Sequence, residues 1–143
     1  MIERVRLSEK FARFTEHWSP KVVGELNGQQ VKLVKFEGTF AWHHHVHEDE
    51  LFLVHRGAFR MEFRDGTVEL AAGDLLVVPR GVEHRPVADE EVEVLLFEPA
   101  STLNTGNVRD ARTEFDQHRL ETAHVARILT LLGRIEQRMA DRI

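Results

Sequence analysis

Imidazole and carboxylate groups are concentrated in one short internal stretch of the chain. The stretch from residue 42 to residue 50 reads WHHHVHEDE, with four histidines and three acidic residues. Imidazole nitrogens and carboxylate oxygens are the ligands that hold divalent metals such as Zn, Fe, Ni and Mn. Because the stretch is internal, a purification-tag remnant does not explain it. These residue types predict a metal site, which needs at least one further ligand from elsewhere.

Strand geometry selects among these side chains. Side chains alternate along a strand, so His43, His45 and His47 are predicted to share one face while His44 points to the other. Glu50 follows a turn and can fold back towards the same face. Two histidines one residue apart and a carboxylate can therefore hold one ion, and the fourth ligand must come from a separate strand.

His84 is the candidate for the fourth ligand, and it ends the second of two sequence patterns that resemble those of the cupin family. Residues 43–57 follow the pattern H-x-H-x4-E-x6-G, and residues 73–84 follow G-x5-P-x-G-x2-H. The resemblance runs from about Trp18 to about Asn107. It is closest to small single-domain cupins described as mannose-6-phosphate isomerase-like, in which WHxH…DE and NTG stretches recur. The resemblance implies metal ligands at His43, His45, Glu50 and His84.

The chain departs from the family patterns at two positions. The spacing from Gly38 to His43 is one residue shorter than in the family, and Ala88 replaces the Asn that often closes the second motif. The first departure leaves open a shifted register in which His45 and His47 are the ligands. We place His43 and His45 first, because only that pair gives the four-residue spacing to Glu50.

The rest of the sequence predicts an all-β domain with a helix at each end, and the resemblance implies a double-stranded β-helix, or jelly-roll, barrel. Many short alternating segments separated by turn signals favour a sandwich or barrel of largely antiparallel strands. We treat residues 1–143 as one cupin domain, with the barrel at about 20–99 and an irregular stretch plus a C-terminal helix at 100–143. A short N-terminal helix is expected over 7–18, ended by Ser19-Pro20. Strands are expected at 22–26, 31–36, 40–47, 51–54, 59–63, 67–70, 75–78 and 92–97, with a hairpin turn at Asn27-Gly28 and a break at 88–90.

Composition excludes several classes of function. The net charge of −5 and the pI near 6.0 argue against a nucleic-acid-binding surface. With no cysteine, the chain has neither a disulfide framework nor a thiolate ligand or nucleophile. No apolar run approaches the ~20 residues that span a bilayer. We expect a cytoplasmic protein whose partner is a small molecule, with no nucleic acid and no membrane.

An apolar stripe marks the C-terminal helix and raises the question of oligomeric state. Its members are spaced by three or four residues, which is typical of one helix face. The helix either packs on its own barrel or also packs on another subunit, and the sequence does not choose between these. The segment 92–97 carries apolar groups on both faces, which together with the stripe favours a homodimer. The stripe consists of Leu120, His124, Ile128, Leu131, Ile135 and Met139.

A site of three histidines and one glutamate leaves coordination positions for a substrate, which suits a metalloenzyme. A metal-dependent isomerase or epimerase and a dioxygenase both remain open. Phe59, Met61 and Phe63 are expected to share an inner face, which suits a small, partly hydrophobic ligand or is simply barrel core. Arg80 and Arg85 are expected to point to solvent, which weakens a sugar-phosphate assignment. The alternatives are a non-catalytic small-ligand module and a barrel that a metal only stabilises.

The other histidines and the acidic turn are expected to have ordinary structural roles. A lone histidine on a strand or helix is more often hydrogen-bonded or solvated than bound to metal. Glu48 and Asp49 are expected to form a solvated turn that at most supports the ligands. The histidines concerned are His17, His44, His55, His118 and His124.

Overall fold

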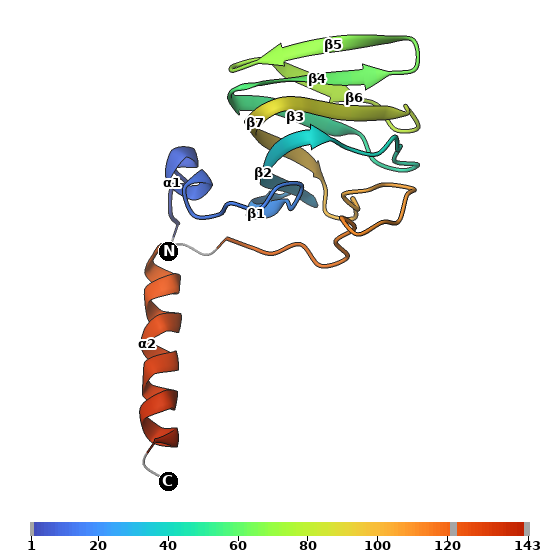
Figure 1. The fold of residues 1–143 in the computed structure, drawn as a ribbon. Coiled ribbons are helices and arrows are strands. Elements are labelled where there is room, and N and C mark those ends of the chain that lie inside the picture. The colour runs from blue at the N-terminus through green and yellow to red at the C-terminus, as the bar shows by residue number, and fades with distance from the viewer. Residues whose placement is uncertain (1, 121–122, 142–143) are drawn as a thin grey trace.

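A computed structural model describes residues 2–120 and 123–141 and has a barrel of strands with one helix at each end (Figure 1). The expected all-β jelly-roll architecture with two terminal helices is confirmed. For residues 123–127 only the backbone is described. The elements are α1 (Leu7–Phe11), β1 (Lys21–Leu26), β2 (Gln29–Thr39), β3 (Glu50–Arg56), β4 (Ala58–Phe63), β5 (Gly66–Ala71), β6 (Leu75–Val78), β7 (His84–Pro99) and α2 (Ala123–Ala140).

The named strands pair only in antiparallel fashion, as the short connections predicted. Their order is β1-β2-β7-β3-β6, and β4 pairs with both β5 and β7. β7 joins the two halves of the barrel. Its first residues, 84–87, pair with β4, and its later residues pair with β2 and β3. This long strand places its N-terminal end at the metal-ligand candidates and its C-terminal end in the middle of the main sheet.

The hairpin between β1 and β2 forms where the sequence predicted it. Asn27 and Gly28 have φ angles of 52° and 76°, and both values lie in the left-handed region. A two-residue turn of this kind matches the twist of the flanking strands, and Asn-Gly is the pair that adopts it with least strain.

The strands bury apolar side chains on both faces of the main sheet. The inner faces form the barrel core, to which Phe52 and Val54 of β3 and Phe59 and Met61 of β4 belong. The outer face of β2 and β7 is covered by the N-terminal segment, where Phe11 and Phe14 pack on Leu33. Such two-sided burial explains why the segment 92–97 is apolar on both faces.

Three expected elements differ from the structure. The N-terminal helix α1 covers only Leu7–Phe11, and its N-cap Arg6 makes no side-chain capping bond. The following residues leave the helix because Trp18, at a φ of 61°, stacks in the core on Phe36 and Phe40 with ring centroids 4.7 Å apart. Tertiary packing overrides the helical periodicity here.

The segment 40–47 is not a strand, apart from one isolated bridge at His43. The strand expected at 92–97 is the long β7, which continues through the predicted break at 88–90. Its antiparallel pairing with β4 and β2 on either side of that point holds this polar stretch extended. The irregular path of 40–47 and the continuous strand β7 therefore depend on the segments that each one pairs with, rather than on local composition.

Helix α2 extends away from the barrel, as Figure 1 shows in orange-red at the C-terminal end. Its apolar stripe does not lie against its own barrel over the described side chains: Ile128, Leu131, Ile135 and Met139 are 43–64% exposed. Leu120, which precedes α2, does contact the Phe11 cluster. His124 lies outside the described side chains. No helix in the described ranges is long and apolar enough to cross a membrane.

Candidate metal centre

The structure brings the four predicted ligand residues together. One ligand atom of each of His43, His45, Glu50 and His84 lies within 4.8 Å of the other three. His43 and His45 come from the irregular segment before β3, Glu50 begins β3, and His84 begins β7. Each residue is at most 5% exposed. The site is therefore enclosed by the barrel.

Hydrogen bonds replace a regular strand in holding the segment that carries His43 and His45. The backbone N–H of His43 donates to the carbonyl of His84 at 3.1 Å, and that of His84 donates back at 2.9 Å. The N–H of Gly81 donates to the carbonyl of His45 at 2.7 Å. Buried backbone groups need such partners. The second motif thus fixes the first, through Gly81 and His84.

Gly106, the last residue of the Asn104-Thr105-Gly106 stretch, and the following Asn107 form a second clamp on the same segment. The N–H of Asn107 donates to the carbonyl of His44 at 3.1 Å, and the His44 N–H donates to Oδ1 of Asn107 at 2.8 Å. Gly106 has a φ of 56°, and a Cβ at this position would overlap the carbonyl of His44 and crowd the His43 ring. Only glycine allows this close approach. The NTG stretch is therefore part of the support of the site.

Two of the imidazole rings are oriented by backbone carbonyls. Nδ1 of His43 lies 2.9 Å from the carbonyl of Ala41, and Nδ1 of His84 lies 2.8 Å from that of Val82. An Nδ1–H that donates to these oxygens leaves the lone pair on Nε2. Metal-binding histidines are commonly held in this way by a partner on the far ring nitrogen.

Three buried atoms of the candidate ligands have no hydrogen-bond partner. Nε2 of His45, Nε2 of His84 and Oε1 of Glu50 have no partner of acceptable geometry, although His45 Nε2 is 2.6 Å and His84 Nε2 is 3.4 Å from Glu50 Oε1. Unpaired buried polar atoms are rare in proteins and require an explanation. A cation bound among these atoms would satisfy all of them, so the residues present fit a divalent metal.

The protonation states at the centre also suit a metal. Burial, together with the neighbouring His84, lowers the pKa of His43 to about 4, so this imidazole is neutral at physiological pH. Burial alone would raise the pKa of Glu50, but the adjacent imidazoles of His45 and His84 outweigh it, and the pKa lies well below its ordinary value. Metal ligands must be deprotonated, and both residues are.

Sequence reasoning missed a charged pair beside the centre. Lys32 of β2 and Glu98 of β7 lie inside the barrel at 0% and 1% exposure, and Lys32 Nζ is 2.7 Å from Glu98 Oε1. Burial and the nearby Glu50 carboxylate raise the pKa of Glu98 well above its ordinary value. The sequence pattern that could have revealed Lys32 is its spacing: it lies on the same face of the strand as Val34 and Phe36, two core residues.

The remaining polar candidates lie outside the centre. His47 is exposed and does not belong to the converging group, so the structure does not support the shifted register of His45 with His47. Asp49 is exposed and accepts hydrogen bonds from the backbone and side chain of Arg80. Arg85 binds Glu62 on the barrel surface.

The other histidines have structural partners rather than metal-site positions. His17 is hydrogen-bonded to Glu91 at 2.7 Å. His55 stacks on Phe11 and lies 3.2 Å from Glu93. The described ligand group contains none of them.

A small cavity of about 30 Å³ adjoins the centre inside the barrel. Its wall includes His43, Glu50 and Glu98, and it has no Lys or Arg among its described lining residues. This volume holds about one water molecule. Of the two readings of the β4 face, barrel core is confirmed, since Phe59 and Met61 are buried in the core and do not line the cavity. The aromatic side chains in the wall are Trp18, Phe36, Phe40 and Phe52.

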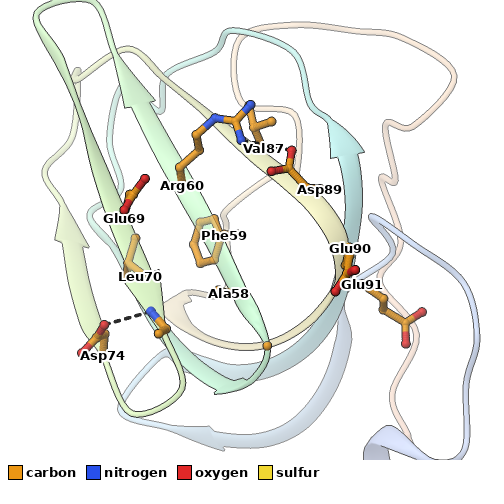
Figure 2. A pocket seen from close by; sticks show the side chains of 12 residues that line it. Ala58, Phe59, Arg60, Glu69, Leu70, Asp74, Val87, Asp89, Glu90 and Glu91 are labelled. Carbon is orange, nitrogen blue, oxygen red and sulfur yellow. Dashed lines mark hydrogen bonds and ion pairs between the residues drawn. The ribbon is translucent and has the colours of Figure 1, made fainter.

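A larger hollow of about 600 Å³ lies elsewhere, over β4 and β5 (Figure 2). It contains none of the four candidate ligands. Its rim is acidic, and two of the groups already have partners: Asp89 binds Arg60 at 3.1 Å and Asp74 accepts from the Ala71 N–H at 2.8 Å. An acidic rim whose groups have such partners does not identify a ligand, so the buried centre remains the candidate functional site.

Comparisons with known proteins agree with this architecture. Residues 30–98 match the sequence profile of the Cupin_2 family, the cupin domain. A cupin-2 domain containing protein from Shewanella frigidimarina NCIMB 400 is 46% identical, with 66% of this chain and 93% of that chain covered and a TM-score of 0.66. Protein NMB1881 from Neisseria meningitidis is 30% identical, with 68% and 100% covered and a TM-score of 0.63.

One curated relative is also similar. The uncharacterised protein YdbB from Bacillus subtilis (strain 168) is 39% identical over 80 residues, which are 55% of this chain and 65% of YdbB. The chain therefore spans just under two thirds of the length of that relative. With its antiparallel barrel, its buried His/Glu group and these matches, the chain belongs to the cupin family, as a small cupin.

Proposed function

We propose that this cupin is a divalent-metal enzyme that acts on a small organic molecule. The metal ligands are His43, His45, Glu50 and His84, and the metal is Zn, Fe, Ni or Mn. The observation that carries the proposal is the convergence of buried ligand atoms that have no hydrogen-bond partner. A site that only stabilised the barrel would be expected to saturate its metal, whereas three histidines and one carboxylate leave a position open on an ion that prefers five or six ligands.

A bound divalent ion would supply Lewis-acid polarisation of a ligand oxygen or, for iron, one-electron chemistry with dioxygen. The side chains of the protein then have separate tasks. His43 and His84 present Nε2 because backbone carbonyls hold their Nδ1 atoms. The aromatic wall keeps bulk water away from the centre, which strengthens electrostatic interactions there. Isomerase-like and dioxygenase-like reactions are both compatible with these tasks.

The cavity supports a small ligand with an apolar part. Apolar side chains, four of them aromatic, form most of its wall, and no Lys or Arg stands among its described lining residues to hold a phosphate. The mannose-6-phosphate isomerase-like label therefore describes resemblance rather than substrate in this proposal. Because the cavity is only about 30 Å³, an organic ligand must enter with movement of side chains such as Trp18 or Phe40, or bind at its edge.

Metal analysis of the purified protein, with two matched histidine variants, tests the proposal. We expect near-stoichiometric divalent metal in the wild type, loss of most metal in His84→Ala, and full retention in His47→Ala, because His47 is exposed and outside the group. If no metal co-purifies and no added divalent ion raises the melting temperature, the enzyme proposal fails. Equal metal content in the two variants would contradict the ligand assignment.

We also propose that the chain is a single-domain cytoplasmic protein that forms a homodimer. The support for the dimer is the exposed apolar stripe of α2, together with Leu75 and Val77 on the outer face of β6, which are 56% and 51% exposed. Apolar patches of this kind commonly mark protein interfaces. Light scattering of the full chain should give the dimer mass, and deletion of the chain after residue 120 should weaken association. A monomeric full-length chain would contradict the dimer.

A further inference from the structure

Three charged side chains stand in a row across neighbouring strands inside the barrel. Lys32 lies on β2, Glu98 on β7 and the metal-ligand candidate Glu50 on β3, and β7 runs between the other two strands. The register places Lys32 opposite Leu96, which makes Lys32 a diagonal neighbour of Glu98, and Leu51 opposite Phe97, which puts Glu50 across from Glu98. All three are at most 5% exposed.

Glu98 contacts both of its neighbours. Its Oε1 accepts a hydrogen bond from Lys32 Nζ at 2.7 Å. Its carboxyl also interacts with the carboxyl of Glu50, which lies on the adjacent strand and lines the same small cavity. Oε2 of Glu98 is buried and has no hydrogen-bond partner. The carboxyl of Glu98 thus links a buried ammonium group to a metal-ligand candidate, and it lines the cavity beside the centre.

Packing does not account for this pair. Burying an ammonium and a carboxyl group removes both from water, and apolar residues of similar volume are often at least as stabilising. The neighbouring inward positions Val34, Val94 and Leu96 are all apolar. Among these described inward positions of β2 and β7, the Lys32–Glu98 pair is the charged exception, and its carboxyl lies beside Glu50.

We propose that the Lys32–Glu98 pair positions Glu50, and that it sets the orientation in which Glu50 presents an oxygen to the metal. This inference rests on the proposed metal centre. Lys32 fixes the carboxyl of Glu98, and Glu98 in turn fixes the carboxyl of Glu50. Glu98 is a positioning residue and not a ligand, since it does not belong to the converging group.

Co²⁺ binding to the full-length chain, freed of metal beforehand, tests the inference. The dissociation constant reports affinity, and the visible absorption of bound Co²⁺ reports the ligand geometry. Glu98→Leu removes the contact to Glu50 and should weaken Co²⁺ binding by about 10- to 100-fold, with a changed spectrum. Glu98→Gln can still accept from Lys32 and donate to Glu50, and should stay within about threefold of the wild type. The Co²⁺ affinity of Lys32→Met should lie between those of these two variants.

Val94→Ala is the matched control, because it damages the barrel interior without touching the pair. It should lower the melting temperature and leave the Co²⁺ spectrum unchanged. If Glu98→Leu binds Co²⁺ with the affinity and spectrum of the wild type, the positioning role is wrong while the metal centre stands. If the wild type itself does not bind Co²⁺, the metal centre is wrong and the positioning role falls with it.

Discussion

The neutral His43 predicts a specific loss of stability in mild acid. In the folded, metal-free chain the pKa of His43 is about 4, against an ordinary value of 6.5. Between these values the unfolded chain binds the proton more strongly, so the free energy of unfolding must fall as the pH falls. The contribution of the neutral His43 to stability is fully present above about pH 6.5 and is lost as the pH falls to about 4. The difference between the two pKa values corresponds to about 3 kcal/mol of unfolding free energy, of which about 2 kcal/mol is lost by pH 5.

Denaturant unfolding of wild type and His43→Gln, at several pH values and with a chelator present, measures this contribution. Other groups also contribute to the pH dependence, among them Glu98, whose pKa burial and the Glu50 carboxylate raise well above its ordinary value. The difference between the two proteins is therefore the relevant quantity, and the wild type should lose about 2 kcal/mol more than the variant between pH 8 and pH 5. An NMR titration of the His43 ring should give a midpoint near 4. Parallel pH profiles, or a midpoint near 6.5, would refute the reasoning.

Two further substitutions test the supports of the site. Gly106→Ala should lower the free energy of unfolding by roughly 1–3 kcal/mol, because the new Cβ meets the carbonyl of His44 at a positive φ. The control Gly66→Ala, at an open position, should have little effect in the same thermal melts. Equal melting temperatures of the two variants would contradict the clamp. Lys32→Met leaves Glu98 buried without its cation, so the free energy of unfolding measured with denaturant should fall by about 3–5 kcal/mol. The double substitution of Lys32→Met with Glu98→Leu should restore most of that loss. A double variant no more stable than the single one would show that the pair is not coupled.

The sequence predicted the parts of the fold that local chemistry determines. The Asn27-Gly28 turn and the alternation of β3, β4 and β6 depend on neighbouring residues, and the structure has them in place. The jelly-roll class came from the resemblance of two motifs, whose four ligand residues converge in the structure. Motif spacing was sufficient for this because each ligand lies near the start of a strand or in the segment before one.

Features that depend on distant contacts were predicted less well. The segment 40–47 was expected to be a strand, yet its partners are Gly81, His84 and Asn107, which no local pattern reveals. Strand alternation still predicted the correct inward pair, because the side chains of His43 and His45 both point inward from the irregular backbone. The Lys32–Glu98 pair was missed, since a charged residue at a strand position is normally taken as solvent-facing.

Anomalous X-ray diffraction from crystals of the protein as purified tests the central claim most directly. The account predicts one anomalous peak, at the absorption edge of a divalent transition metal, bound by Nε2 of His43, His45 and His84 and by Oε1 of Glu50. An open coordination position should face the small cavity. The absence of a peak among these four side chains in crystals grown with added metal, or a peak coordinated by His47 in place of His43, would contradict it.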